Sequence, residues 1–186
     1  MRIVSGEFGS RRLETLKGNN TRPTLDKVRE AVFSSLGGFF DGGNFLDLYA
    51  GSGAVGLEAL SRGCSFAVLN DKSRDAFKVI QANVKTLKVE DRTKVYCMND
   101  MKLLSILETK EMQFDMVYLD PPYAKEKNMK VMKALCEKHL LKDQAIVIVE
   151  SLKEDEYDDV VEDLEVVKVA HYGISKITYY KNKEVA

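Results

Sequence analysis

Residues 45–63 read FLDLYAGSGAVGLEALSRG, and this stretch decides the fold. Its first six residues, 45–50, are mainly apolar and have the length of a buried strand. A turn that contains Gly51 and Gly53 follows, and the next ten residues, 54–63, predict a helix. A strand, a glycine-rich turn and a helix in this order are typical of α/β folds that hold a nucleotide-like ligand at the turn.

The alternation of strand and helix continues toward the C-terminus. Strands are expected at 66–71, 94–98, 114–120 and 145–150, and helices at 73–87, near 101–108 and around 128–140. The strand segments are almost continuously apolar, as in parallel strands that are buried on both faces. The sequence therefore predicts a doubly wound, mostly parallel α/β sheet.

The two ends of the chain add antiparallel pairs to this sheet. Segments 164–173 and 175–181 are joined by too short a link for a crossover, so an antiparallel C-terminal hairpin is expected. Segment 2–16 alternates apolar and polar residues around a glycine-containing turn, which predicts an N-terminal β-hairpin. The acidic segment 153–163 is interpreted as a solvated helix.

A first helix is expected between the N-terminal hairpin and residue 45. Apolar residues recur at helical spacing, Thr24 can act as its N-cap, and Gly37-Gly38 ends it. A chain of 186 residues suffices for one sizeable domain. We therefore expect a single domain over 1–186, with the hairpin 1–22 as an appendage and 23–186 as the core.

The glycine turn carries a candidate cofactor site. Residues 51–56 form Gly-X-Gly-X-X-Gly, and Asp71 ends the next strand, where its carboxylate can accept hydrogen bonds from ribose hydroxyls. This pattern alone suits a nicotinamide dinucleotide as well as other adenosine-bearing cofactors. Asp47 favours S-adenosylmethionine, because a carboxylate is unfavourable beside pyrophosphate and favourable beside a sulfonium or ammonium group. Asn99-Asp100, after the third strand, could hold an adenine amine.

The motif Asp120-Pro121-Pro122-Tyr123 follows the strand FDMVYL directly and is the most specific signal in the chain. The exocyclic amine of a base is a poor nucleophile because its lone pair is delocalised into the ring. The Asp120 carboxylate and the Pro121 carbonyl can accept hydrogen bonds from the amine and aim its lone pair, while the prolines stiffen the loop. Tyr123 offers a face for stacking an extruded base.

Composition narrows the class of protein. Hydrophobic residues make up 45% and charged residues 31%, as in an ordinary globular protein. No apolar run approaches the roughly 20 residues of a membrane helix and no signal-peptide core is present, so a cytoplasmic location is expected. The three cysteines and two histidines are isolated from one another, so no metal site is expected.

Charge is distributed unevenly along the chain. The net charge is −1, yet residues 1–29 carry a net +4 and residues 150–165 a net −8. Such asymmetry can mark one surface for a polyanion. The candidate contacts with the phosphates of a polyanion are Arg11, Arg12, Arg22 and Arg29.

Together, DLYAGSGAVGLEALSRG, DPPY after FDMVYL, and RPTLDKVREAVFSSL resemble the bacterial 16S ribosomal RNA guanine-N2 methyltransferases of the RsmD type. GEFGSRRL and HYGISKITYYK are similar to that family too, so the resemblance runs nearly end to end. It implies a Rossmann-like class I methyltransferase that transfers a methyl group from S-adenosylmethionine to N2 of one guanine in 16S rRNA, within the 30S subunit or its assembly intermediate. A monomer is expected rather than an obligate oligomer.

The resemblance also implies the residues of the site. The cofactor positions are Asp47, Tyr49, Gly51, Ser52, Gly53, Gly56, Asp71, Lys72 and Asp100, and the catalytic positions are Asp120, Pro121, Pro122 and Tyr123. One triplet departs from the family, which usually has Glu-Lys-Asp after the second strand. Here Asp71 keeps the carboxylate on a shorter arm, and Ser73 replaces a second acid.

Three other functions remain open at this level. A methyltransferase with the same motif could act on adenine N6 or on a protein glutamine, because an amide poses the same lone-pair problem. A nicotinamide-dependent oxidoreductase would leave Asp47 and the DPPY motif unexplained. A non-catalytic RNA-binding module would not need an intact DPPY motif.

Overall fold

The computed structural model describes residues 1–17, 23–122 and 124–183, so Arg22 and Tyr123 lie outside the described residues. The chain divides into two compact units, 1–98 and 99–186. Within the described ranges, no helix is long and apolar enough to cross a membrane. The single domain expected over 1–186 stays a prediction.

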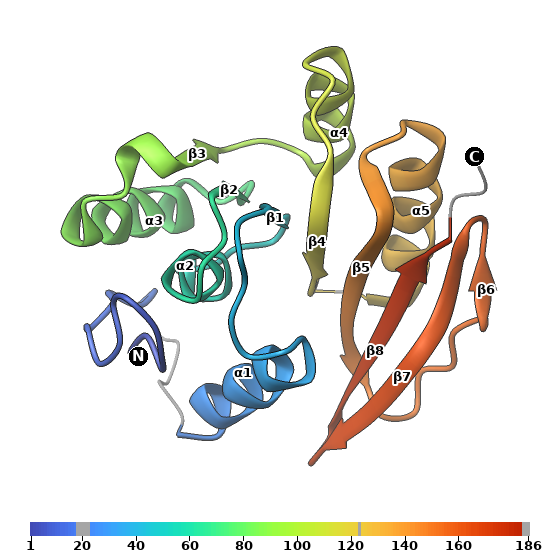
Figure 1. The fold of residues 1–186 in the computed structure, drawn as a ribbon, viewed down its shortest axis with the longest axis horizontal. Helices are drawn as coiled ribbons and strands as arrows, with labels where there is room; N and C mark the ends of the chain where they lie inside the picture. The colour runs from blue at the N-terminus through green and yellow to red at the C-terminus, as the bar shows by residue number, and fades with distance from the viewer. Residues whose placement is uncertain (18–22, 123, 184–186) are drawn as a thin grey trace. The chain divides into compact units, whose positions relative to one another are not determined.

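The first unit alternates strands and helices around a parallel sheet (Figure 1). Its strands pair in parallel in the order β3-β2-β1, with Leu46 in register with Val68, and Val68 with Lys94. The central residues of β1 and β2 are apolar and fully buried, as the sequence predicts. The elements are α1 (Pro23–Ser35), β1 (Asn44–Asp47), α2 (Ala54–Ser61), β2 (Phe66–Asn70), α3 (Arg74–Leu87), a 3-10 turn (Glu90–Arg92) and β3 (Thr93–Tyr96).

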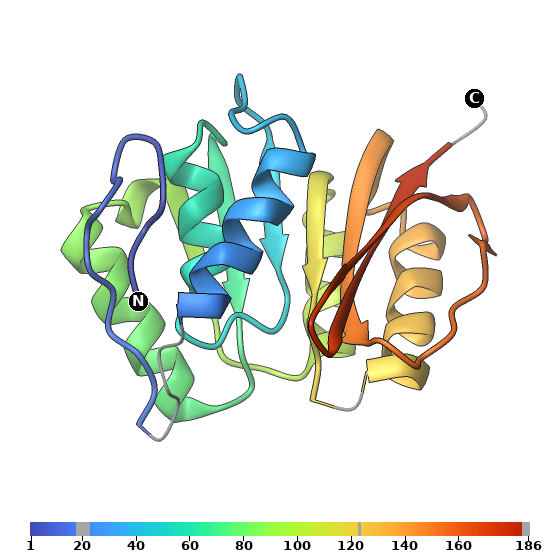
Figure 2. The ribbon, with the colours of Figure 1, turned by 90° about the horizontal axis from the view of Figure 1, so that it is seen from below.

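The N-terminal segment pairs with itself, but less regularly than a hairpin of two strands. The Ile3 N–H donates to the Arg11 carbonyl at 3.0 Å, the Leu13 N–H donates to the Met1 carbonyl at 2.9 Å, and Arg2 and Arg12 form a single antiparallel bridge. Ile3 and Leu13 are buried. The segment runs alongside the helices of the first unit (Figure 2), so it is part of that unit's packing.

Helix α1 differs from the prediction at its start and agrees with it at its end. It begins at Pro23, whose fixed φ suits the first helical position, so Thr24 lies inside the first turn and is not the N-cap. At the other end the Gly38 N–H donates to the Phe33 carbonyl at 2.9 Å, which closes the helix at the expected Gly37-Gly38 pair.

The second unit confirms the predicted change from parallel to antiparallel pairing. Its strands lie in the order β4-β5-β8-β7-β6; β4 and β5 are parallel, and the later pairs are antiparallel. Strands β7 and β8 form the expected C-terminal hairpin (Figure 1). The elements are α4 (Asp100–Thr109), β4 (Phe114–Leu119), α5 (Ala124–Glu137), β5 (Leu141–Leu152), β6 (Val160–Val161), β7 (Leu164–Tyr172) and β8 (Ser175–Asn182).

The helix predicted over 153–163 is wrong. Residues 153–159 are irregular, and β6 pairs antiparallel with β7, where Val161 is in register with Leu164. Like charges at helical spacing repel one another, whereas pairing with β7 buries Val161 and satisfies backbone groups. The Tyr180 hydroxyl also donates to the Asp158 carbonyl at 2.7 Å and holds this segment in its irregular form.

Candidate functional site

Asp47 is a buried carboxylate that is hydrogen-bonded to the last glycine of the motif. It is the last residue of β1, and its Oδ2 accepts a hydrogen bond from the Gly56 N–H at 3.0 Å, inside the first turn of α2. Only 1% of Asp47 is exposed. Its pKa is raised to about 7, chiefly by burial; the Gly56 hydrogen bond opposes this shift, and the nearby charge of Asp71 adds to it. This carboxylate therefore gains or loses its charge near neutral pH.

Gly56 and Gly51 differ in whether a side chain could be accommodated at their positions. A Cβ added to Gly56 would lie 2.1 Å from the Leu69 Cδ2 atom and 3.3 Å from the Asp47 Cβ, so glycine lets α2 pack closely on β1 and β2. Gly51 has a φ of +59°, and a Cβ added there would meet nothing within 4 Å. Packing does not require Gly51, and the open space leaves its backbone accessible to a ligand.

Asp71 is hydrogen-bonded to the glycine loop. Its Oδ2 accepts a hydrogen bond from the Gly51 N–H at 3.0 Å, and its Oδ1 accepts one from the Ser73 N–H at 3.0 Å. Ser73 in turn caps α3, because its hydroxyl accepts from the Ala76 N–H at 3.3 Å. The residue that departs from the family pattern thus has a structural role. Lys72 is exposed and Tyr49 is half-buried.

Two asparagines that the sequence motifs did not single out connect the segments around this site by hydrogen bonds. Asn70 donates to the carbonyls of Leu48 (3.2 Å) and Met98 (3.1 Å), so it ties the residues after β1 to those after β3. Asn83, buried on α3, donates to the carbonyls of Ser52 (2.8 Å) and Glu14 (3.0 Å). The only signal in the sequence was a polar residue within an apolar pattern, as at the end of FAVLN.

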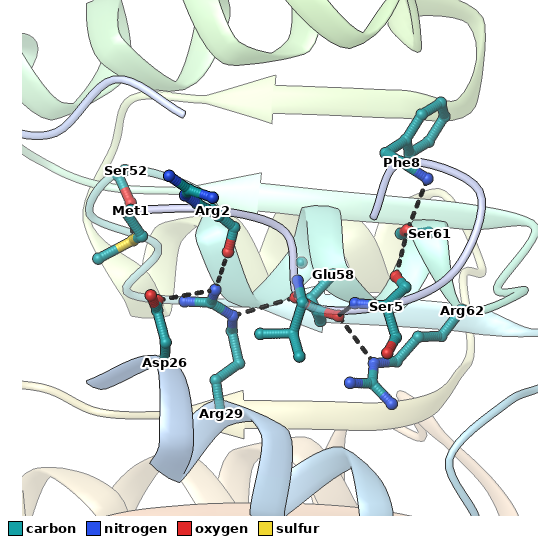
Figure 3. A network of polar contacts seen from close by, with 12 residues as sticks. Met1, Arg2, Ser5, Phe8, Asp26, Arg29, Ser52, Glu58, Ser61 and Arg62 are labelled. Atoms are coloured by element: carbon teal, nitrogen blue, oxygen red, sulfur yellow. Dashed lines mark hydrogen bonds and ion pairs between the residues drawn. The ribbon is translucent and has the colours of Figure 1, made fainter. Parts of the chain in front are cut away.

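Glu58 is the centre of a buried polar network in the first unit (Figure 3). It is fully buried on α2, and its carboxylate accepts from Arg29 Nε at 3.1 Å and Arg62 Nε at 2.8 Å. The same carboxylate accepts from the backbone N–H groups of Val4 (2.8 Å) and Ser5 (3.0 Å). One side chain therefore fixes α1 and the N-terminal segment to α2.

The four arginines proposed to contact RNA separate into different environments. Arg29 is buried and also contacts Asp26 at 3.1 Å and the Arg2 carbonyl. The Arg29 guanidinium already has buried partners, which disfavours the contact with RNA phosphate that the sequence predicts for it. Arg11 and Arg12 are exposed, and Arg11 donates to the Thr86 carbonyl at 3.0 Å. Arg22 lies outside the described residues.

Asp100 begins α4 in the second unit. The Asn99 side chain caps that helix, accepting from the Met101 N–H at 3.0 Å, and the Asp100 Oδ1 accepts from the same N–H at 2.7 Å. Asp100 is 5% exposed, and its Oδ2 lies 3.1 Å from Lys127 Nζ on α5. Its predicted contact with an adenine amine stays a prediction.

Asp120, Pro121 and Pro122 line a hollow of about 450 Å³ in the second unit. This volume is within the roughly 300–1,000 Å³ of small-molecule sites. Pro121 is buried, while Asp120 and Pro122 are exposed at the hollow, and Tyr123 lies outside the described residues. The other lining residues come from α5, the end of β5, the segment that follows it and the start of β8, and are Lys125, Glu126, Glu150, Ser151, Leu152, Asp155 and Ser175.

Asp155 lines the hollow, and polar contacts hold the segment 153–159 to which it belongs. Asn128, fully buried on α5, donates to the Tyr157 hydroxyl at 3.2 Å. Lys176 donates to the Asp155 carbonyl, and its ammonium lies 5.7 Å from the centre of the Tyr157 ring. The acidic segment therefore borders the hollow in a defined conformation.

Comparisons with known proteins agree over nearly the whole chain. The family model described as Conserved hypothetical protein 95 matches residues 1–181. The Bacillus subtilis protein YlbH is 35% identical over 98% of this chain and 100% of its own length. Ribosomal RNA small subunit methyltransferase D of Escherichia coli is 33% identical over 81% of this chain and 74% of its own. The solved structure of the E. coli protein yhhF is 28% identical, covers 98% of each chain and superposes with a TM-score of 0.85.

Proposed function

This chain belongs to the family described as Conserved hypothetical protein 95, and we propose from that premise that it transfers a methyl group from S-adenosylmethionine to the N2 amine of one guanine in 16S rRNA. Relatives named as rRNA methyltransferases support the rRNA substrate class. The observation that carries the proposal is the hollow beside Asp120 and Pro121, where acceptors face a space large enough for an extruded base.

The residues of the first unit fit the proposed cofactor. The open space at Gly51 lets a ligand approach the backbone, and the Asp71 carboxylate beside it can accept hydrogen bonds from ribose hydroxyls. Asp47 places a titratable carboxylate under the same loop, where it can become charged opposite a cationic ligand. When bound, the cofactor supplies an electrophilic methyl group.

The residues of the second unit act on the target base. Asp120 and the Pro121 carbonyl accept hydrogen bonds from the amine and hold it with its lone pair directed outward. Tyr123 stacks on the base, and the two prolines restrict the loop that carries these groups. No general base of raised pKa is needed, because the amine proton can leave after the methyl group arrives.

The proposal is tested by incubating the full chain with tritiated S-adenosylmethionine and 30S particles that lack the modification, followed by nuclease digestion and nucleoside analysis. We expect label in N2-methylguanosine with the wild type and none with Asp120→Ala. Asp143→Ala, an exposed aspartate on β5, is the matched control and should behave as wild type. Label in N6-methyladenosine or in protein would overturn the proposal in favour of the other methyl acceptors.

A further inference from the structure

We infer that Glu150 reads the N1–H group of the target guanine and thereby excludes adenine from the hollow beside Asp120. This inference rests on the proposed function and names the residue that would determine its base specificity. It concerns a carboxylate that the sequence motifs did not single out.

The pairing of β4 with β5 places Glu150 beside Asp120. Leu119, the last residue of β4, is in register with Val149, so Asp120, which directly follows β4, lies beside Glu150 on β5. Side chains in register on parallel strands project to the same side of a sheet. Both residues line the same hollow, which agrees with this placement.

Tyr118 fixes the orientation of the Glu150 side chain. Tyr118 is 6% exposed on β4, and its hydroxyl donates a hydrogen bond to Glu150 Oε2. A carboxylate has about four acceptor sites, so this bond leaves acceptor capacity for a ligand. Glu150 is half-buried on a regular strand, which holds it more rigidly than a loop would.

The chemistry of the two purines explains why a fixed carboxylate would discriminate between them. Guanine presents two neighbouring donors, the N2 amine and N1–H, whereas the N1 of adenine is an acceptor. With the amine on Asp120, the adjacent N1–H would meet Glu150. An adenine in the same pose would place a lone pair against a carboxylate, and a site built for a donor strongly rejects an analogue that lacks it.

The other acidic side chains of the hollow are less suited to this role. Glu126 is exposed in the first turn of α5. Asp155 belongs to the irregular segment 153–159, where its backbone carbonyl already accepts from Lys176. Glu150 combines a strand position beside Asp120 with a buried hydroxyl that orients it.

The test uses 30S particles that carry either guanine or 2-aminopurine at the position found by mapping the methylated nucleotide. 2-Aminopurine keeps the N2 amine but has an unprotonated N1. Wild type should methylate the guanine particle and reject the 2-aminopurine particle. Glu150→Gln, whose amide can donate to N1, should lose about 10- to 150-fold in kcat/KM on guanine and gain on 2-aminopurine.

Controls separate base recognition from folding and from cofactor binding. Glu126→Gln alters a carboxylate of the same hollow and should leave the guanine preference unchanged, while Tyr118→Phe should weaken it by a smaller factor than Glu150→Gln. Affinity for S-adenosylhomocysteine should be unchanged in all three variants. An unchanged guanine to 2-aminopurine ratio in Glu150→Gln and Tyr118→Phe, or a shifted ratio in Glu126→Gln, overturns the inference. If wild type forms no N2-methylguanosine, the proposed function itself fails.

Discussion

Arg29 on α1 and Glu58 on α2 form an ion pair at 3.1 Å in which both side chains are at most 5% exposed. The pair lies inside the first unit. The Glu58 carboxylate also pairs with Arg62 and accepts hydrogen bonds from two backbone N–H groups of the N-terminal segment. An arginine selected from charge distribution as an RNA contact is therefore part of the structural core. The consequence concerns stability rather than substrate binding.

Glu58→Gln should destabilise the protein by about 3–5 kcal/mol, because it removes the fully buried counter-charge that Arg29 and Arg62 share and leaves Arg29 with only the partly exposed Asp26. Urea unfolding measures this loss, and limited proteolysis should show earlier cleavage within residues 1–17. The matched control is Glu7→Gln, which breaks the exposed pair with Arg92 and should cost less than about 1 kcal/mol. Equal losses for the two variants would show that the buried network contributes no more than a surface pair.

Asp47→Asn should change how stability depends on pH. The folded pKa of Asp47 is raised to about 7 from an ordinary value of 3.8, so its stabilising contribution is complete below pH 4 and is lost as pH rises through 7. Asparagine can still accept from Gly56 and does not titrate. Between pH 5 and pH 8 the free energy of unfolding of the variant should rise by about 3 kcal/mol relative to that of wild type. The wild type loses about 1.4 kcal/mol for each of the roughly two pH units between pH 5 and its folded pKa.

Urea unfolding of both proteins at several pH values measures this difference. Asp41→Asn, an exposed aspartate before β1, serves as the control and should follow wild type across the range. Parallel stability profiles for Asp47→Asn and wild type would mean that Asp47 has the same charge in the folded and unfolded chain.

The sequence predicted the features that depend on local pattern. The strand, turn and helix of 45–63 were predictable because apolar runs and glycines specify them locally, and Gly56 and Asp71 occupy the positions that the motif requires. The link between residues 173 and 175 was short enough to require the antiparallel β7–β8 pair.

Features that depend on distant partners were not predictable in this way. Glu58 is one acid in an apolar helix, and nothing in its neighbours shows that Arg29 and Arg62 converge on it. The acidic run 153–163 has the composition of a solvated helix, but the available edge of β7 determined its actual structure. Glu150 ends the apolar run 145–150, and its proximity to Asp120 follows only from the register of β4 with β5.

Asp71→Ala should weaken binding of S-adenosylhomocysteine about 10- to 150-fold while leaving the fold intact. The loss of a hydrogen bond to a charged group costs about 1.5–3 kcal/mol of binding free energy. The same variant also removes the hydrogen bond that the Gly51 N–H donates to Asp71. Isothermal titration measures the affinity. Ser73→Ala removes the cap of α3 without removing the carboxylate, so it should lower stability and leave affinity unchanged. Unchanged affinity in Asp71→Ala would mean that another residue holds the ribose.

Arg11 and Arg12 remain the described candidates for contact with RNA phosphate, and the structure distinguishes them. Arg11 donates to the Thr86 carbonyl near the C-terminus of α3, where a cation also interacts favourably with the helix dipole. Arg12 is exposed beside its antiparallel partner Arg2. Neighbouring residues on an extended segment face opposite ways, so the two side chains need not act on the same surface.

The double variant Arg11→Ala/Arg12→Ala should raise the apparent KM for the ribosomal substrate and leave cofactor affinity unchanged. Each phosphate contact that is lost should reduce the steepness of the salt dependence by about one unit of slope, because fewer counterions are released on binding. Arg12→Ala alone should carry most of this change, whereas Arg11→Ala should mainly lower stability through the lost bond to Thr86. Steady-state kinetics at several salt concentrations measure the slope. If the double variant keeps the KM and slope of wild type, the N-terminal segment does not belong to the RNA-binding surface.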